Sequence, residues 1–339
     1  MRPSQPPPPT AELYGREGFR GDQVILIHAD YPMRFKRVSG PIAERSFCVE
    51  DLGTEDATRA DGAPLRLLYH DDLVIWVSKR REAMPFVYRN ADGDELHFVE
   101  RGRFLYQTDF GPLELGESEF IVIPRTVSYR VVPLTADNVV IISESPHRLE
   151  VDVPAGYGLF VDMVSTVAPK PEPMDGGRRD EHELRIKRDG EITTYVYDRF
   201  PLDTVAYLGK SPVFKFDYSD VHQPSVAEAI LNPAKFFGTK DNRVLLCVLK
   251  SRPSIRPPIH RNVDYDEVIY YHRGPGSYGG VRRPGTFILT PKGINHQGAP
   301  EDVPEGFAAM QYQTRGTFRM TPEALAVSAL VDPATKGKL

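Results

Sequence analysis

The sequence predicts an all-β protein built from two β-barrels of one type, and three observations support this. Prolines (31) and glycines (27) interrupt the 339 residues throughout. Between them lie short runs rich in Val, Ile, Phe and Tyr, such as "DLVIWVSK", "FIVIP" and "NVVIIS". Runs of four to eight residues between turn signals are typical of sandwiches and barrels. One β pattern occurs twice, and at ~150 residues per domain the length allows two domains.

The repeated pattern is carried by "GDELHFVERG" at 93–102 and "DEVIYYHRG" at 266–274. In each copy a glutamate, Glu95 or Glu267, is followed by six residues and then a glycine. Both runs then reach a Phe-Ile-x-x-Pro, "FIVIP" in the first copy and "FILTP" in the second. Two anchors at similar separation indicate two copies of one β unit, which is a duplicated small barrel.

Other elements follow from composition. Helical patterns are confined to 223–237 and 321–331, where Thr321 can cap a helix that begins with Pro322. The segment "APKPEPMDGGRRDE" at 168–181 is rich in Pro, Gly and charge, which indicates a surface linker. The expected organisation is an N-terminal arm and strands packing on the barrels over 1–64, a first barrel over 65–167, a linker over 168–181, a second barrel over 182–320, and a C-terminal helix and tail over 321–339.

Composition and charge exclude several classes of function. The formal net charge of −5 gives no basic surface for nucleic acid or for a membrane. The longest apolar runs, such as "VLLCVL" at 244–249, are far shorter than the ~18–20 residues of a membrane span. The N-terminus lacks the apolar core of a secretory signal, and two cysteines give no disulfide framework, so that Cys247 is expected to be a buried apolar residue. We expect a cytoplasmic protein.

The second copy carries residues that can bind a metal. His260 and Asn262 share one face of a strand by the period of two, Glu267 follows on the same ladder, and His296 comes from another strand. Two imidazoles and one carboxylate inside a barrel can occupy one face of an octahedral ion, which is the ligand set of non-haem Fe(II) oxygenases. The alternatives are ordinary core or surface histidines and a solvated glutamate at a strand end.

The first copy offers different chemistry at the matching positions: Asn90, Asp92, Glu95 and Tyr129. With no imidazole on the matching strands, this set is a poor site for a transition metal. We therefore expect a structural first barrel filled with apolar side chains, its mouth closed by residues such as Phe98 and Phe120. One transition-metal ion per chain, within 182–320, follows from this difference.

The motifs resemble those of a known family. The spacing G-x5-P-x-G-x2-H from Gly285 to His296 is similar to the second cupin motif, and "HRN" followed by a glutamate and a glycine resembles the first. That triplet, together with 90–131 and 205–218, more narrowly resembles homogentisate 1,2-dioxygenase. The resemblance implies two jelly-roll barrels, Fe2+ held by His260, Glu267 and His296, and opening of a dihydroxylated aromatic ring with O2.

The sequence departs from the family at groups that contact substrate. Leu208 stands at the position of the family's acid/base histidine, and Pro258 replaces a tyrosine two residues before the first ligand. Thr290 or its neighbour stands where the family has a second substrate-contacting histidine. We therefore expect the metal site to be kept and the substrate to be an aromatic acid other than homogentisate.

Three residues are candidates for the remaining catalytic work: His222, His272 and Tyr278. A base must remove a proton from the substrate hydroxyl, and His222 or His272 can supply it, as can water or a carboxylate of the substrate. The alternative for His272 is a salt bridge at the barrel rim, and for His222 and Tyr278 an ordinary surface position. We expect a small aromatic substrate and O2 as partners, in a homo-oligomer.

Two rival classes of function remain open from the residues alone. One is a metal cupin with non-oxidative chemistry, such as an isomerase or a decarboxylase. The other is a regulatory cupin that binds a small molecule and whose ion is structural. Oxygen consumption with aromatic diols separates both from a dioxygenase.

Overall fold

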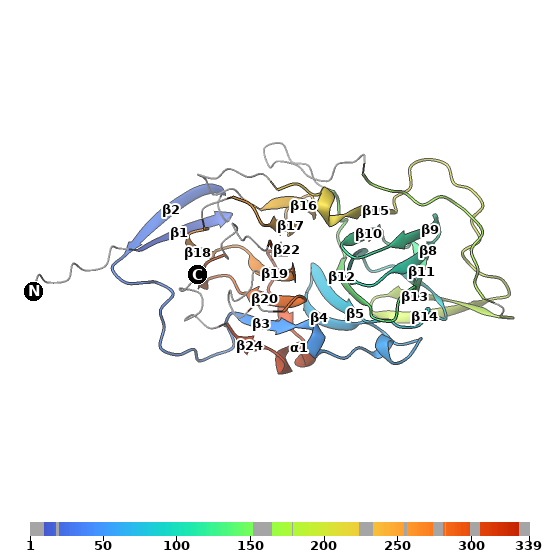
Figure 1. Ribbon diagram of the computed structural model, residues 1–339, viewed down its shortest axis with the longest axis horizontal. Helices are drawn as coiled ribbons and strands as arrows, with labels where there is room; N and C mark the ends of the chain where they lie inside the picture. The colour runs from blue at the N-terminus through green and yellow to red at the C-terminus, as the bar shows by residue number, and fades with distance from the viewer. Residues whose placement is uncertain are drawn as a thin grey trace, which may run out of the picture.

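The computed structural model confirms the all-β prediction: two strand-built barrels lie side by side along its long axis, with few and short helices (Figure 1). None of the helices in the described part of the chain is long and apolar enough to cross a membrane. The described residues are 10–17, 20–151, 165–177, 179–223, 233–253, 256–273, 281, 283–298 and 306–331.

The first barrel consists of two sheets. One has the strand order β15-β10-β7-β12-β5-β4-β23 and the other β14-β13-β6-β11-β8-β9. The bounds are β4 (Leu65–His70), β5 (Leu73–Ser78), β6 (Val87–Asn90), β7 (Asp94–Arg101), β8 (Phe104–Thr108), β9 (Gly111–Leu115), β10 (Glu119–Ile123), β11 (Ser128–Pro133), β12 (Val139–Ser145), β13 (His182–Arg188), β14 (Glu191–Tyr197), β15 (Phe214–Asp217) and β23 (Arg319–Met320).

The second barrel repeats this plan. Its sheets have the orders β16-β17-β22-β19-β20-β3-β24 and β2-β1-β18-β21. The bounds are β1 (Thr10–Glu17), β2 (Arg20–His28), β3 (Arg45–Cys48), β16 (Ala234–Gly238), β17 (Val244–Lys250), β18 (Ile259–Asn262), β19 (Asp266–Arg273), β20 (Thr286–Thr290), β21 (Asn295–His296), β22 (Ala308–Thr314) and β24 (Ala329–Leu330). Three short 3-10 turns, η1 (Val49–Asp51), η2 (Glu55–Ala57) and η3 (Tyr218–Asp220), complete the connections.

The two halves exchange strands, and this corrects the expected boundary at residue 182. The hairpin β13–β14 lies parallel to β6, and β15 pairs with β10, so residues 182–217 belong to the sheets of the first barrel. In return, β1 lies parallel to β18, and β3 pairs with β20 of the second barrel. Sequence patterns locate strands but not their partners, because pairing over more than a hundred residues leaves no local signature.

The barrels pack back to back through one apolar core. Along β7, Leu96 and Phe98 point away from the interior of the first barrel, and the ring of Phe98 lies 6.4 Å from that of Tyr270 on β19. Phe120 stacks on Phe216 at 4.8 Å in the same core. The expectation that Phe98 and Phe120 close the mouth of the first barrel is therefore wrong. Alternation along a strand sends them to the face opposite Glu95.

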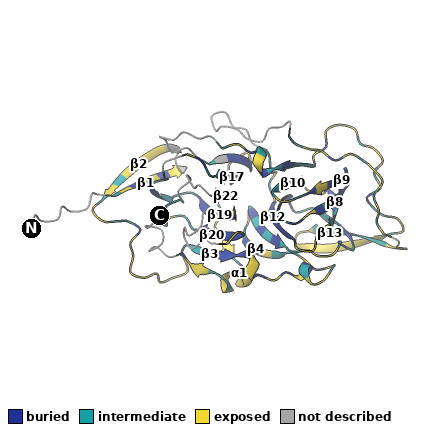
Figure 2. Ribbon diagram, viewed as in Figure 1, coloured by how far each residue is buried: buried dark blue, intermediate teal, exposed yellow. Residues whose placement is uncertain are grey.

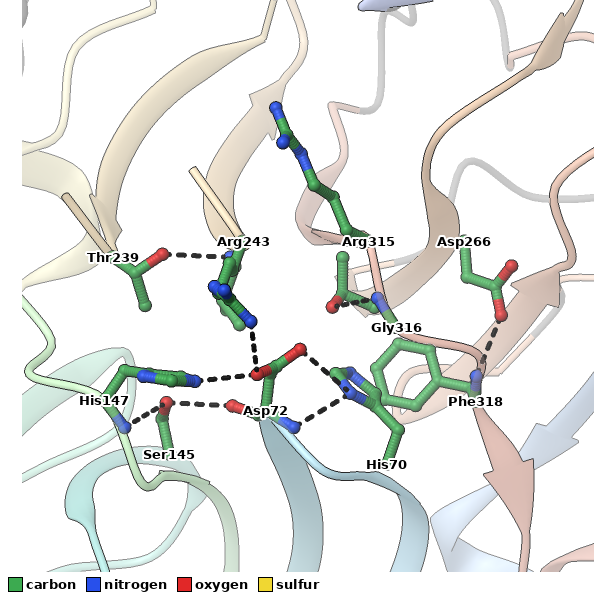
Figure 3. A network of polar contacts seen from close by, with 12 residues as sticks. His70, Asp72, Ser145, His147, Thr239, Arg243, Asp266, Arg315, Gly316 and Phe318 are labelled. Carbon is green, nitrogen blue, oxygen red and sulfur yellow. Dashed lines mark hydrogen bonds and ion pairs between the residues drawn. The ribbon is translucent and has the colours of Figure 1, made fainter. Parts of the chain in front are cut away.

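Burial follows the same arrangement, with dark strands at the centre of the molecule and exposed residues along the outer hairpins (Figure 2). A polar junction also joins the halves, centred on Asp72 in the β4–β5 turn (Figure 3). The Asp72 carboxylate lies 2.7 Å from His147 Nε2 and 3.6 Å from Arg243 Nη1, and Arg243 precedes β17 of the second barrel.

The helical predictions are met at one place. Thr321 caps α1 (Pro322–Ala326) by accepting from the Ala324 N–H, as expected, but the helix ends sooner because 329–330 pair with β3. Of the second expected helix, residues 224–232 lie outside the described residues. Residues 234–237 belong to β16 instead, where pairing with β17 overrides a local helical pattern.

Candidate metal centre

Strand pairing brings the three predicted ligands together. β18 and β21 pair with His260 directly opposite His296, and β19 carries Glu267 on the facing sheet. The donor atoms of the three side chains all lie within 4.8 Å of one another. Their exposed fractions are 7%, 3% and 4% for His260, Glu267 and His296. The cluster therefore lies inside the second barrel, shielded from bulk water.

Backbone carbonyls orient both imidazoles. His260 Nδ1 lies 3.0 Å from the Pro258 carbonyl, and His296 Nδ1 lies 3.0 Å from the Ile294 carbonyl. A carbonyl can only accept, so each Nδ1 carries a proton, and each ring in its neutral form presents the lone pair of Nε2 to the cluster. This tautomer is the one that a metal-binding histidine needs, with its second nitrogen donating to an outer group.

Three amides hold the carboxylate of Glu267. Asn262 Nδ2, Gln311 Nε2 and Gln313 Nε2 donate to its Oε2 at 3.2, 2.8 and 3.2 Å. Oε1 is left facing His296 Nε2 at 3.6 Å. Burial acts to raise the pKa of Glu267, but the hydrogen bond and charge that His296 supplies when protonated, with the charge of a protonated His260, outweigh it, so the pKa falls to about 2. The carboxylate is ionised at neutral pH and its orientation is fixed.

These residues fit a borderline divalent cation. Two imidazole nitrogens and one carboxylate oxygen converge from three strands, and the outer hydrogen bonds keep all three in their ligating states. Such a set, with coordination positions left for substrate, is that of non-haem Fe(II) sites. Oxygen-only clusters suit Mg2+ or Ca2+ instead. The side chains of this chain would thus hold Fe2+ at one face.

The three catalytic candidates are not brought to this cluster. His272 lies five residues along β19 from Glu267, ~17 Å at 3.3 Å per residue, on the opposite face. Its ring nitrogens lie 2.7 Å from Glu100 and 2.9 Å from Ser118 of the first barrel. His272 thus joins the two barrels. His222 is exposed, and Tyr278 lies outside the described residues.

The positions that depart from the family have distinct surroundings. Leu208 is 103% exposed, in the loop between β14 and β15. Pro258 supplies the carbonyl that accepts from His260, a role that its side chain does not affect. Thr290 is buried opposite Glu267 and donates to Glu44 at 3.1 Å. The chain therefore differs from the family both beside the carboxylate and at the surface.

The sequence analysis missed the glutamines that hold Glu267. Gln311 and Gln313 alternate in "AAMQYQT" of β22, so the period of two already placed both on one face. The missing information was the pairing of Gln313 with Glu267, which only the sheet register supplies.

In the first barrel, Tyr88 and Tyr129 pair across β6 and β11 where the second barrel has its two imidazoles. Glu95 keeps the place of Glu267 on β7, and Asn90 donates to it at 2.7 Å as Asn262 does to Glu267. One prediction fails: an imidazole is present, because His97 lies 3.2 Å from Glu95. "ELH" places both on one face, so the period of two could have found it.

His97 does not complete a metal site among the described residues. Its Nε2 faces Glu95 and its Nδ1 lies 3.1 Å from the Tyr106 hydroxyl, so both ring nitrogens are hydrogen-bonded. The Tyr129 hydroxyl donates to Glu95 at 2.7 Å. Burial acts to raise the pKa of Glu95, but His97 outweighs it, and the pKa is lowered. This cluster is a hydrogen-bonded network.

Fold and site together define a class: two cupin-like barrels, one of which carries a candidate metal site. The family described as "Homogentisate 1,2-dioxygenase N-terminal" matches residues 66–218. A protein of Saccharolobus solfataricus, provisionally named dioxygenase SSO1533, is 24% identical over 78% of this chain and 74% of its own. Homogentisate 1,2-dioxygenase of Pseudomonas putida is 27% identical over 56% of this chain. These matches confirm the resemblance to the homogentisate 1,2-dioxygenase-like bicupin family.

The sequence match covers only part of the homogentisate 1,2-dioxygenases. The match spans 47% of the Pseudomonas enzyme, about half its length. Among solved structures, an oxalate decarboxylase of Bacillus subtilis superposes with a TM-score of 0.45 at 11% identity, over 81% of this chain and 78% of the other. A glyoxylate-induced protein of Pseudomonas aeruginosa gives a TM-score of 0.44 over 86% of this chain.

Proposed function

We propose that this protein is an Fe2+-dependent dioxygenase that opens the ring of a dihydroxylated aromatic acid with O2. The observation that carries the proposal is the buried cluster of His260, Glu267 and His296, whose outer hydrogen bonds at Nδ1 orient both imidazoles with Nε2 towards the cluster. The dioxygenase names of the relatives support the same class of reaction.

The residues of the chain have separate tasks in this proposal. His260, Glu267 and His296 would hold the ion, while Asn262 and the two glutamines keep the carboxylate aimed at it. When bound, Fe2+ would supply the Lewis acid and redox chemistry that brings the ring of the substrate and O2 to react within one complex. Burial excludes bulk water from the cluster and strengthens its electrostatic interactions.

The substrate we propose is an aromatic diol acid other than homogentisate. Leu208 is at the surface and replaces the acid/base histidine that the family resemblance implies. Thr290 offers a hydroxyl beside Glu267 where the family has an imidazole. A substrate for this site therefore makes fewer contacts with protein side chains than the family resemblance implies for homogentisate, or makes contacts with different side chains.

An oxygen electrode tests the activity. Protein loaded anaerobically with Fe2+ should consume O2 with at least one of gentisate, homogentisate and related diols, and the product should show the absorbance of an opened ring. If none of the diols causes oxygen consumption, the proposal is overturned in favour of a non-oxidative or regulatory cupin. Fast turnover of homogentisate would overturn the substrate restriction alone.

Metal content tests the ligand set. We expect one iron per chain, held in the second barrel, and almost none after His296→Ala, because two protein ligands hold Fe2+ weakly against buffer. His147→Ala is the matched control, since His147 contacts Asp72 outside the cluster. Undiminished iron in the His296 variant, or two ions per chain, would contradict the assignment.

A further inference from the structure

The first barrel contains a cavity of about 350 Å3 around the positions that correspond to the metal centre of the second. This volume lies in the range of about 300–1,000 Å3 that small-molecule sites occupy. Asp61 and Ile192, both exposed, form part of the lining, so the cavity reaches solvent. Six aromatic side chains form part of the wall: Trp76, Phe86, Tyr88, Phe104, Tyr106 and Tyr129.

Two of the three buried carboxylates that line this cavity, Glu95 and Glu144, already have their partners. Glu95 accepts from an asparagine and a tyrosine and faces His97, as described above. Glu144 accepts from Trp76 Nε1 at 3.1 Å and from Asn90 Nδ2 at 2.9 Å, and pairs with Lys187. Neither carboxylate therefore needs a cationic ligand.

The buried guanidinium of Arg80 is different. Its side chain lines the cavity with only 5% of the residue exposed, and its Nη atoms donate to the backbone carbonyls of Ala60 and Gly62. It forms no ion pair with any carboxylate in the described part of the chain. Burial lowers the pKa of Arg80, against the opposing charge of Asp56, which reflects the cost of keeping this cation away from water.

Asp56 is the carboxylate whose charge acts most strongly on Arg80, but its oxygens accept hydrogen bonds from other groups. It accepts from the hydroxyls of Thr54 and Ser78 and from the Lys79 N–H. Tyr88 also lines the cavity, and its hydroxyl makes no hydrogen bond within the described residues. The unmet capacity of the cavity thus consists of donors: one guanidinium and one phenol.

We propose that this cavity of the first barrel binds a small aromatic carboxylate. The ring lies among the tyrosine and phenylalanine walls, the carboxylate pairs with Arg80, and Tyr88 donates a hydrogen bond to it. An anion gains most here, because a buried charge that lacks a counter-ion is costly and its neutralisation is strongly favourable. The proposal is independent of the metal centre and of the reaction proposed for it.

The single tryptophan of the chain provides the test, because Trp76 lies in the cavity wall. The fluorescence of the full-length protein is followed during titration with benzoate, its neutral isostere benzamide, and benzylamine. We expect a saturable change with benzoate, at least ten-fold weaker binding of benzamide, and none of benzylamine. No saturable change with benzoate, or equal affinity for benzamide, would overturn the proposal.

Variants locate the bound anion. Arg80→Met should weaken benzoate binding at least ten-fold and Tyr88→Phe about five-fold, the value of one hydrogen bond. Arg103→Met, at a surface arginine, should leave affinity unchanged. His296→Ala should also keep it, which separates this site from benzoate binding at the metal centre; loss of the Trp76 response in that variant would place the ligand there instead. If Arg80→Met does not fold, the proposal is tested by the affinity of Tyr88→Phe for benzoate and by the ratio of the benzoate and benzamide affinities of the wild-type protein.

Discussion

At the scale of the residue, the candidate metal centre depends on hydrogen bonds that orient its three side chains. Gln311 donates to Glu267 at 2.8 Å, the shortest of the three amide bonds to that oxygen. Without it the carboxylate would gain freedom to turn away from His296. The ligands therefore act only with their outer partners in place.

Gln311→Leu should weaken metal binding by about 10-fold to 100-fold, the range for outer partners of metal ligands. Competition with a chelator measures this, using Fe2+ or Co2+. Gln107→Leu is the control, because Gln107 lies in the first barrel and bonds to the Asp175 carbonyl. Unchanged metal affinity in the Gln311 variant would show that the other two amides suffice.

His70 links protonation to stability. Its Nδ1 accepts the Asp72 N–H at 3.1 Å, which requires the neutral ring, although the Asp72 carboxylate lies 3.9 Å away (Figure 3). Burial, the largest cause, lowers the pKa of His70 below the ordinary 6.5 of an imidazole. The geometry and the direction of the shift agree that the folded state holds a neutral imidazole.

As the pH falls below about 6.5, the unfolded state protonates His70 before the folded state does. The free energy of unfolding should therefore decrease, and His70→Asn, which keeps an acceptor, should show a smaller decrease. Urea unfolding of both proteins at pH 7.5 and 5.5 measures the difference. At pH 7.5 the free energy of unfolding of His70→Asn should be about 1 kcal/mol lower than that of the wild type, because the buried ring is missing. An equal pH dependence in both proteins would contradict the neutral assignment.

At the scale of the element, the exchanged hairpins cover the barrels in different ways. In the hairpin β1–β2, Glu12 is 1% exposed and accepts from Asn295 at 2.9 Å, with His28 at 2.8 Å and Arg261 at 2.9 Å. Asn295 and Arg261 are the strand neighbours of the two ligand histidines. Glu12 thus fastens the hairpin to the strands that carry the imidazoles.

Glu12→Ala should cost about 2–3 kcal/mol, because it removes charge-assisted hydrogen bonds from a buried site. It should also lower iron retention. Glu183→Ala in the corresponding hairpin is a matched control: its pair with Arg185 is partly exposed to solvent and should contribute about 0–1 kcal/mol. Denaturant unfolding and iron analysis measure both effects. Equal losses in the two variants would show that the buried carboxylate has no special role.

At the scale of the whole molecule, the barrels share one core and a buried polar contact. Phe98, Tyr270 and His272 meet between them, and His272 Nδ1 lies 2.7 Å from Glu100 of the first barrel. Neither sheet can expose this face without losing the packing of both. The two barrels should therefore unfold together.

Phe98→Ala should destabilise the protein by about 3–5 kcal/mol, as for a large side chain lost from a core. The fluorescence of Trp76 reports on the first barrel and iron release on the second, and both should move to the same lower denaturant concentration. Phe35→Ala, at an exposed ring, should move neither. Two separate transitions in the wild-type protein would contradict the shared core.

The sequence by itself determined the class of fold and a candidate set of metal ligands. Runs of apolar residues between turn residues gave strands, and the repeated Glu-to-Gly and Phe-Ile-x-x-Pro spacings gave two barrels, because these patterns are local. Period-two alternation placed His260 with Asn262, and the cupin spacing added Glu267 and His296. The capping of α1 by Thr321 was equally local.

Only the tertiary structure decided how distant strands pair. It assigned 182–217 to the first barrel and turned Phe98, Phe120 and His272 towards the barrel junction. It also brought Gln311, Gln313 and Thr290 beside Glu267. Such partners come from register and sheet packing, which involve segments a hundred or more residues apart. The energy of each pairing is shared over a whole sheet, so no short stretch of sequence specifies it.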